Sequence, residues 1–306
     1  MKRWYLYPFS LVYSMITAVR NQMYNWGILK STKFNIPVIG VGNLSVGGSG
    51  KSPMVMYLAG LFAPNYRTGV LSRGYGRKTT GYYVVNYDSN YNMVGDEAMQ
   101  LFQRFKNRLV IGVCENRVAG ARKLIEDMDL GVLILDDSYQ HRAIQAGFNI
   151  LLTDYNDPYF KDYVLPAGNL REPRAGVKRA DIIMVTKCPE SLSVEKKQYY
   201  LSRIKPMKHQ KVFFSSIDYA ENIFSNTESI PVEELSRYEV LLITGIANPT
   251  LVVKELSKYT DRIKHLKYRD HYSFTTEDIR NIAKEYSQMG EQRIILTTEK
   301  DYVRLM

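Results

Sequence analysis

Cysteine is nearly absent from this chain, with Cys114 and Cys188 the only two among its 306 residues. Two cysteines supply neither a disulfide framework nor the spacing of metal ligands, so a disulfide-rich or zinc-stabilised fold is excluded. We expect both side chains to pack in the core, which fits a reducing cytosol. Low-complexity tracts and internal repeats are also missing, and the length predicts two domains.

A long run of Lys and Arg is missing too, although the net charge is +10. Such a charge suits nucleic acid, a membrane surface or an anionic substrate. No zinc-finger or helix-turn-helix pattern stands out, and many of the 24 tyrosines alternate with apolar residues, which indicates packing rather than base stacking. We therefore expect no nucleic-acid partner.

What the sequence does contain is a glycine-rich turn between an apolar run, residues 36–41, and a predicted helix, residues 53–62. This strand–loop–helix order is typical of a phosphate-binding P-loop. Glycines let backbone N–H groups close around phosphate oxygens, and the helix N-terminus adds partial positive charge. The predicted ATP-binding residues are Ser45, Val46, Gly47, Gly48, Ser49, Gly50, Lys51 and Ser52.

Within this loop, Lys51 is predicted to reach the β- and γ-phosphates, and the Ser52 hydroxyl to bind Mg²⁺. Ser45 stands where the usual motif has its first glycine. The alternative is a plain glycine-rich turn without a ligand. The lysine, the hydroxyl and the flanking elements together favour the phosphate site.

A second apolar run, residues 132–135, ends in Asp136 and Asp137. A carboxylate at the tip of a buried strand beside a P-loop is suited to holding Mg²⁺, directly or through water. We therefore assign the metal to Ser52 and Asp136, and we count Asp136 and Asp137 among the catalytic residues. A strand that runs into an acidic turn is common, so this assignment depends on the neighbouring P-loop.

Asp96 and His271 each allow two interpretations. Asp96 follows Gly95 at the start of a predicted helix, where it either caps the helix or acts as a base or as a positioner of metal or water. His271 follows Asp270 and is either a structural side chain or an oriented general base.

Arginines recur in the loops that follow predicted strands, where ligands bind in parallel α/β sheets. Arg73 lies in a glycine-rich turn, Arg117 opens a predicted helix, and Arg171 precedes Glu172. Each alone is an ordinary surface charge, but their shared position favours anion binding. The predicted substrate-binding residues are Arg73, Arg117, His141, Arg171 and Glu172.

The chain alternates strand and helix, which predicts an α/β fold with a P-loop NTPase-like, three-layer parallel sheet and a second, smaller α/β domain. The predicted strands of the first domain are residues 69–72, 109–113, 132–135, 149–153 and 182–186, and its helices are 96–105, 117–128 and 194–204. The second domain has predicted strands 240–244, 263–267 and 294–297 and helices 249–258 and 276–289. The predicted domains are an amphipathic helix in 1–30, the P-loop domain in 31–210, a linker region in 211–236 and the smaller domain in 237–306.

Acidic residues are absent from residues 1–30, whose positive charges are Lys2, Arg3, Arg20 and Lys30. Residues 4–19 form an uncharged, aromatic-rich run that is shorter than the roughly 20 residues of a spanning helix. One apolar stripe at helical spacing comprises Val12, Met15, Val19, Met23 and Trp26. This segment is a signal peptide, a helix packed on the core, or a helix lying in a bilayer interface. A signal peptide is disfavoured because a P-loop follows closely and ATP is cytosolic. We favour the interface, because a basic, aromatic, amphipathic helix is suited to it.

Taken in order, these motifs resemble the tetraacyldisaccharide 4′-kinase family over nearly the whole chain. The matching segments are Val41-Gly42-Asn43-Leu44, Gly47-Gly48-Ser49-Gly50-Lys51-Ser52-Pro53, Arg73-Gly74-Tyr75-Gly76-Arg77, Gly95-Asp96-Glu97, Asp136-Asp137 with Gln140-His141, Leu165-Pro166-Ala167-Gly168, Leu170-Arg171-Glu172-Pro173, Thr186-Lys187-Cys188-Pro189, Asp270-His271-Tyr272 and Thr298-Glu299-Lys300-Asp301.

The resemblance implies a kinase of the lipid A pathway that uses ATP and moves its γ-phosphoryl group to the 4′-hydroxyl of an acylated glucosamine disaccharide 1-phosphate. It places the protein peripherally at the cytoplasmic face of the bacterial inner membrane. It also implies an Asp–His pair, which maps onto Asp96 and His271. Since these two lie in different predicted domains, we expect the domains to close for catalysis.

The sequence departs from the family's pattern at two points. Ser138 stands where members usually have Gly or Ala, which affects the shape of the loop. Members generally continue beyond the Thr298-Glu299-Lys300-Asp301 motif, so we expect either a short variant or a chain that lacks a segment completing the fold.

Two alternative functions are a membrane-bound P-loop ATPase switch without a small-molecule acceptor and a kinase for another membrane sugar or isoprenoid. A GTPase is disfavoured by two motifs. Asp136-Asp137-Ser138-Tyr139 lacks the glycine of D-x-x-G, and Thr186-Lys187-Cys188-Pro189 lacks the final acid of N-K-x-D.

Overall fold

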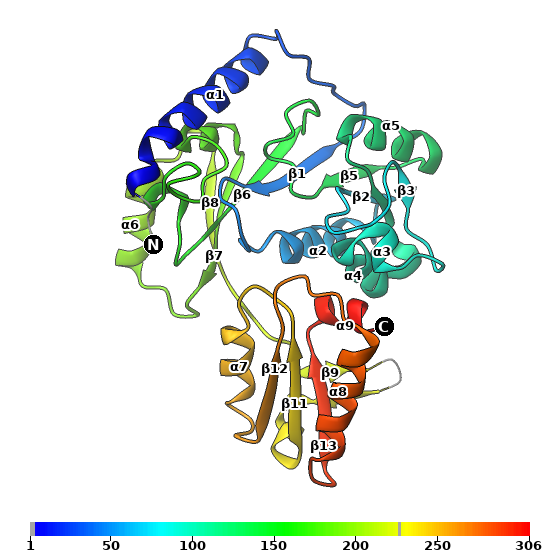
Figure 1. Cartoon of the computed structure of the whole chain (residues 1–306). Coiled ribbons are helices and arrows are strands. Elements are labelled where there is room, and N and C mark those ends of the chain that lie inside the picture. Colours follow the sequence, from blue (N-terminus) through cyan, green and yellow to red (C-terminus); the bar gives the residue numbers. More distant parts are fainter. Residues whose placement is uncertain (1–3, 226–227) are drawn as a thin grey trace. The chain divides into compact units, whose positions relative to one another are not determined.

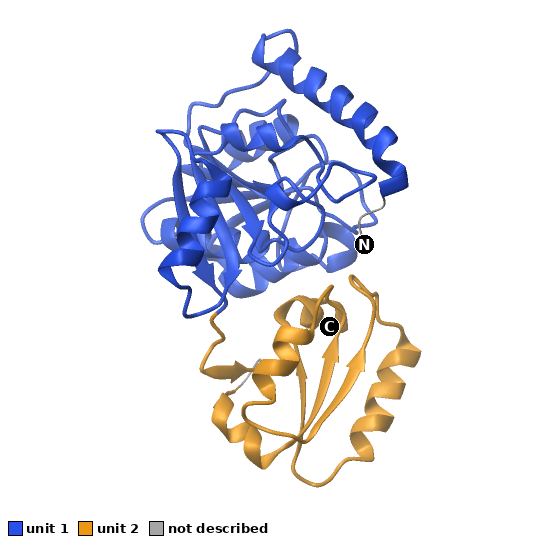
Figure 2. Ribbon diagram, turned by 90° about the vertical axis from the view of Figure 1, so that its left-hand side faces the viewer, with its two compact units in different colours: residues 1–217 blue, residues 218–306 orange. Residues whose placement is uncertain are grey.

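The computed structural model describes residues 4–225 and 228–306 (Figure 1). The chain forms two compact units, residues 1–217 and 218–306, which Figure 2 colours separately. The division falls inside the predicted linker region 211–236. This stretch contributes β8 (Lys211–Ser216) to the sheet of unit 1 and the antiparallel pair β9 (Asn222–Phe224) and β10 (Ser229–Pro231) to unit 2.

Unit 1 is built on an eight-stranded sheet in the order β3-β4-β2-β5-β1-β6-β7-β8. Neighbouring strands are parallel except β3, which runs antiparallel to β4. Its other strands are β1 (Val38–Asn43), β2 (Thr68–Ser72), β3 (Tyr83–Val84), β4 (Val110–Val113), β5 (Val132–Leu135), β6 (Phe148–Asp154) and β7 (Ile182–Cys188). β1 lies inside the sheet between β5 and β6, and all six of its residues are buried.

Helices cover both faces of this sheet, with α2 and α4 on one side and α5 on the other (Figure 1). The longer helices are α2 (Lys51–Phe62), α4 (Asp96–Phe105), α5 (Arg117–Met128) and α6 (Val194–Ile204). The shorter ones are η1 (Trp4–Leu6), α3 (Tyr91–Val94), η2 (Lys106–Arg108), η3 (Tyr159–Lys161) and η4 (Arg174–Arg179). Leu124 of α5 joins Leu71 and Leu133 of the sheet in one buried cluster. The predicted three-layer parallel sheet is therefore confirmed.

The helix after the phosphate loop, α2, begins at Lys51, two residues before the predicted start. Gly50 adopts a φ of 88°, a left-handed conformation that suits glycine, and this turns the chain directly into the helix. Lys51 and Ser52 therefore lie in the first helical turn, where the helix dipole favours an anion.

The N-terminal helix, α1 (Tyr7–Asn25), packs on unit 1 through its polar side. The buried Ser10 Oγ accepts the N–H of Ala167 at 2.8 Å, and the Asn21 amide donates to Glu172 at 2.9 Å. The opposite side exposes the apolar residues Phe9, Leu11, Val12, Met15, Ile16 and Val19.

The predicted apolar stripe of this helix does not pack into the core, because Val12, Met15, Val19 and Trp26 are exposed and Met23 is half-buried. The helix does fold against the rest of unit 1, as one of the alternatives expects, but the side that packs is the polar one and not this stripe. No helix in residues 4–225 or 228–306 has the length and apolarity needed to cross a bilayer. Lys2 and Arg3, which belong to the predicted positive charge of this segment, lie outside the described residues.

Unit 2 contains a three-stranded parallel sheet in the order β12-β11-β13. The strands are β11 (Glu239–Thr244), β12 (Ile263–Lys267) and β13 (Arg293–Thr297), and the helices are η5 (Val232–Arg237), α7 (Thr250–Leu256), α8 (Thr276–Ser287) and α9 (Glu299–Leu305). Strand β11 contributes to two clusters of buried side chains. Leu242 belongs to one cluster and Leu241 to the other. The predicted smaller α/β fold is confirmed, and α9 is an addition to the predicted elements.

Candidate active site

The phosphate loop joins β1 to α2 at the carboxyl edge of the sheet. Its tip at Val46, Gly47 and Gly48 is exposed, whereas Ser49 is buried. Thr186, near the end of β7, donates its hydroxyl to the backbone oxygen of Ser49 at 2.9 Å. The loop is thereby fixed on one side by a neighbouring strand.

Its other side is fixed by the segment that contains Arg171. The N–H of Val46 donates to the Asn169 oxygen at 2.8 Å, and the N–H of Arg171 donates to the Leu44 oxygen at 2.7 Å. These backbone contacts bring the Arg171-Glu172 motif, which is far away in sequence, directly beside the loop.

Lys51 lies at the centre of the candidate site. Its Nζ is 3.5 Å from the Asn43 side-chain oxygen and 3.7 Å from an Asp137 carboxylate oxygen. Asn43 also donates its amide to Ser49 Oγ at 2.8 Å. Arg171 holds the Asp137 carboxylate from another direction at 2.9 Å. The structure thus brings the predicted P-loop lysine and one of the paired acids together.

The two adjacent acids differ in their electrostatics. Burial, together with the negative charges of Glu97 and Asp137, raises the pKa of Asp136 to about 7. Burial would also raise the pKa of Asp137, but the positive charges of Lys51 and Arg171 outweigh it and hold that pKa below its ordinary value. Asp137 is therefore a stable anion at neutral pH. Asp136 titrates near neutral pH, and a cation bound beside it would favour release of its proton to solvent.

Two further observations concern the predicted metal ligands. Oδ1 of Asp136 is buried and has no hydrogen-bond partner among the described residues. Ser52 Oγ donates to Glu97 at 3.2 Å. Within residues 4–225 and 228–306, no three His, Cys, Asp or Glu side chains gather closely enough to hold a metal by themselves.

Asp96 is the first residue of α4 and is buried. The helix cap is Gly95, with a φ of 91°, and the Asp96 carboxylate accepts the N–H of Glu97 at 2.9 Å. The interpretation of Asp96 as the helix cap is therefore wrong, because Gly95 holds that position and Asp96 lies inside the first turn. Asp96 also stands one residue before Glu97, the partner of Ser52.

The predicted substrate-binding residues occupy different environments. Arg73 is exposed, whereas Arg117 is 4% exposed and donates to the backbone oxygens of Cys114 and Asp136, each at 3.0 Å. Burial lowers the pKa of Arg117 to about 10, which leaves it charged at neutral pH. For His141, burial and the charges of Arg117 and Arg73 lower the pKa to about 4, so the imidazole is neutral.

Arg171 and Glu172 point into different networks. Arg171 contacts Asp137, as described above, whereas Glu172 is 3% exposed and bonded on both carboxylate oxygens to Asn21, Gln140 and Arg179. The binding roles of all five residues stay predictions.

His271 lies in unit 2, in the loop after β12, and its φ of 55° places it in the left-handed region. Its N–H donates to the Gly245 oxygen at 3.1 Å, and its Nε2 is 3.2 Å from Lys300 Nζ. Arg304 also donates to the Gly245 oxygen, at 3.1 Å. Unit 2 therefore gathers two of the sequence motifs, around His271 and Lys300, at the carboxyl edge of its own sheet.

Comparison with known proteins identifies the family. A family model described as tetraacyldisaccharide-1-P 4′-kinase matches residues 2–306. The chain belongs to this kinase family. The tetraacyldisaccharide 4′-kinase of Flavobacterium johnsoniae is 44% identical over 301 residues, which are 98% of this chain and 86% of the relative. That of Bacteroides thetaiotaomicron is 39% identical over 315 residues, with 99% and 83% covered.

Among solved structures, LpxK from Aquifex aeolicus in complex with ATP matches with a TM-score of 0.78 and 33% identity, covering 100% of this chain and 90% of that chain. Membership of the tetraacyldisaccharide-1-P 4′-kinase family makes the chain an ATP-using kinase of lipid A biosynthesis. The predicted family, enzyme class and fold are confirmed, and the ATPase-switch alternative is not favoured.

In this member of the kinase family, sequence reasoning missed several residues that shape the site. Asn43 contacts Lys51 and Ser49, Glu97 accepts from Ser52, and Lys187 contacts the Gly48 oxygen and pairs with Asp154 at 2.7 Å. Their position at the ends of strands could have indicated them, because Asn43 is the last residue of β1 and Lys187 lies near the end of β7.

Proposed function

We propose that this kinase transfers the γ-phosphoryl group of ATP to the 4′-hydroxyl of tetraacyldisaccharide 1-phosphate, using the residues around Lys51. The observation that carries the proposal is the position of Lys51. Its ammonium group lies between Asn43 and Asp137, in the first turn of the helix that follows a glycine-rich loop. Such a cation beside backbone N–H groups can stabilise charge on a transferring phosphoryl group.

Mg²⁺ is the cation we propose to accompany ATP. The fit is supported by the unpartnered, buried Oδ1 of Asp136 and by the hydroxyl of Ser52. Mg²⁺ usually takes one or two protein ligands and completes its shell with phosphate oxygens and waters, so a site of few ligands suits it. Ser52 and Asp136 would hold the ion, which would neutralise phosphate charge during transfer.

For the acceptor, we propose that Asp96 takes the proton of the 4′-hydroxyl and that His271 assists it. Asp96 is buried at the N-terminus of α4, next to the residue that holds Ser52. Asp137 remains anionic and orients Lys51. Arg73, Arg117, His141, Arg171 and Glu172 are proposed for recognition of the sugar and phosphate groups.

We also propose that the enzyme works at the cytoplasmic face of the inner membrane and is attached peripherally through α1. This is supported by the outward apolar side of the helix and by the absence of acidic residues from residues 1–30. Such a helix buries its apolar side at the boundary between headgroups and acyl chains.

The test is transfer of labelled γ-phosphate to tetraacyldisaccharide 1-phosphate in detergent micelles. We expect label in the lipid for the wild type. Lys51→Ala should lower transfer by at least about 100-fold, as loss of a transition-state donor does. Asp96→Ala should lower it by about 100-fold or more, as loss of a general base does. Near-normal turnover by Asp96→Ala would contradict its role as the base.

A further inference from the structure

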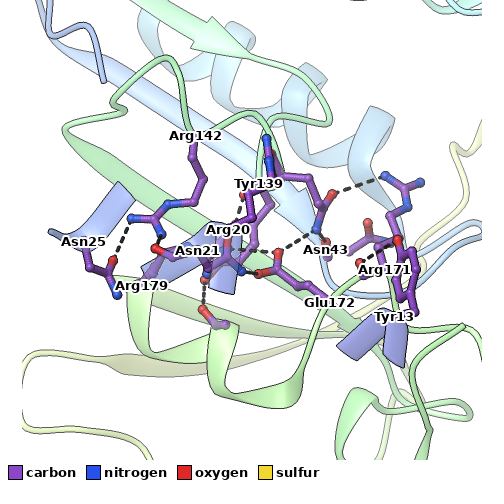
Figure 3. Close-up of polar contacts among 12 residues, drawn as sticks. Tyr13, Arg20, Asn21, Asn25, Asn43, Tyr139, Arg142, Arg171, Glu172 and Arg179 are labelled. Carbon is purple, nitrogen blue, oxygen red and sulfur yellow. Dashed lines mark hydrogen bonds and ion pairs between the residues drawn. The ribbon is translucent and has the colours of Figure 1, made fainter. Parts of the chain in front are cut away.

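The polar side of α1 makes contacts that continue through Glu172 toward Asn43 and Arg171, which flank the phosphate loop (Figure 3). We propose that Asn21 of α1 is a positioning residue for the phosphate loop and acts through Glu172 and Gln140. The inference rests on the proposed kinase function and concerns the support of its ATP site.

The first link joins the helix to a buried carboxylate. The Asn21 amide donates to Oε2 of Glu172 at 2.9 Å. The other oxygen, Oε1, accepts from Gln140 and from Arg179, each at 2.9 Å. A buried carboxylate requires hydrogen bonds on both oxygens, and within residues 4–225 and 228–306 the donor to Oε2 is Asn21.

The second link is the side chain of Gln140, whose hydrogen-bonding groups are all used. Its Nε2 donates to Glu172 at 2.9 Å and to the backbone oxygen of Asn43 at 2.8 Å. Its Oε1 accepts from Arg171 at 3.4 Å. An amide side chain has two donors and one carbonyl, so its orientation is fixed by these three contacts together.

The third link reaches the loop itself. Asn43 is the last residue of β1, and its side chain contacts Ser49 at 2.8 Å and Lys51 at 3.5 Å. A parallel branch runs from Gln140 through Arg171 to Asp137, which lies 3.7 Å from Lys51. Both branches start at Gln140 and end at the same ammonium group.

Loss of the Asn21 amide would leave one oxygen of Glu172 buried without its donor. The carboxylate would then move toward another donor or admit water, and Gln140, which shares it, would shift as well. Since Gln140 also holds the Asn43 backbone, the position of Lys51 would change. The side of α1 opposite its apolar surface would therefore set the geometry of the phosphate loop.

The test compares Asn21→Ala with Thr17→Val in the full-length protein. Thr17 lies one helical turn earlier, and its hydroxyl bonds to Tyr13 and Ser14 of its own helix. We expect Asn21→Ala to lower kcat about tenfold, because misplacement of catalytic groups by about 1 Å can cost up to roughly 100-fold. Affinity for a fluorescent ATP analogue, measured without lipid, should also weaken several-fold. Binding to detergent micelles and the KM for lipid should stay near wild type, and Thr17→Val should match the wild type throughout.

Asn21→Leu serves as a second variant, because it keeps nearly the size of the side chain and removes the same donor without adding a charge beside Glu172. If Asn21→Ala fails to fold, this variant carries the test with the same expected result. A double-mutant cycle of Asn21→Ala with Gln140→Ala should give less than the product of the two kcat losses, since both act on one chain of contacts.

Two outcomes would overturn the inference. One is a rise in the lipid KM alone, which would mean that Asn21 only helps to anchor the helix. The other is a pair of independent, multiplicative effects in the double-mutant cycle. Failure of the proposed function would look different, because the wild type would then bind the ATP analogue without labelling the lipid.

Discussion

At the scale of single residues, the neighbours Asp136 and Asp137 show how position separates two identical side chains. Asp137 has a φ of 45°, which turns it toward Lys51 and Arg171, and their charges keep it ionised. Asp136 points into the buried edge of the sheet, where its carboxylate has negative neighbours. Asp137 can orient the ammonium group of Lys51, and Asp136 can bind a cation from solution.

The raised pKa of Asp136 predicts a pH-dependent stability. In the unfolded chain its pKa is about 3.9, and in the folded protein it is about 7. Between these values the unfolded chain has lost the proton and the folded protein has kept it, so stability falls as pH rises through this window. Asp136→Asn should therefore raise the melting temperature in metal-free buffer at pH 8 and change it little at pH 4. The limiting gain is on the order of 4 kcal/mol.

Thermal melting of the two proteins at pH 4, 6 and 8 measures this difference. Asp137→Asn is the control, because the pKa of Asp137 is lowered and its replacement should destabilise the protein near neutral pH. A gain for Asp136→Asn that is equal at all three pH values would contradict the assigned cause.

At the scale of elements, α1 is unusual because its polar side packs on the protein and its apolar side faces outward. A helix that served only the core would have the reverse arrangement. The contacts of Ser10 and Asn21 hold the helix, so its outer side chains contribute little to folding. They are available for a lipid surface.

This arrangement predicts a difference between two matched leucines. Leu11 on α1 and Leu61 on α2 are each 55% exposed. Leu11→Gln should weaken binding to phospholipid vesicles by about tenfold, since removal of a buried apolar side chain costs roughly 1.5–3 kcal/mol. Leu61→Gln should leave vesicle binding unchanged, and neither variant should lower the melting temperature by more than a degree or two. Co-sedimentation with vesicles measures the binding, and equal losses for both variants would argue against α1 as the contact surface.

The elements themselves were largely predictable from the sequence. Continuous apolar runs such as 132–135 gave buried parallel strands, and the turn at Gly50-Lys51-Ser52 located the phosphate loop correctly. Periodicity alone left the orientation of α1 open, and the partners of its polar side were not predictable, because periodicity does not say which neighbour a face meets. Asn43 and Gln140 were missed as supports for a similar reason. Their importance comes from contacts between residues that are 97 positions apart in sequence.

At the scale of the whole molecule, the residues proposed for catalysis are divided between two units. The phosphate loop, Asp96, Asp136 and Asp137 all belong to unit 1, whereas His271 and Lys300 belong to unit 2. Each unit has its own buried core, so a substitution in one can alter its own site while the other stays folded.

His271→Ala tests this division. We expect kcat to fall by about 100-fold, the lower range for loss of acid–base assistance, while the affinity for an ATP analogue stays unchanged. His265→Gln is the control, because it removes the other histidine of unit 2 and can keep a hydrogen bond to Thr244. Single-turnover kinetics and nucleotide titration separate the two effects. Weakened nucleotide binding in His271→Ala would contradict the expectation that unit 1 binds the nucleotide without His271.

The outward apolar side of α1 also has a consequence for the self-association of the purified protein. In aqueous buffer without detergent, the apolar side chains on this side, which include Phe9, Val12, Ile16 and Val19, are exposed to water. They can be buried by contact with the same side chains of other copies of the protein. We expect the purified protein to form large, polydisperse particles in aqueous buffer and to become monodisperse when a mild detergent is added. We therefore expect the solubility of the protein to depend on the detergent or lipid present as well as on its own surface.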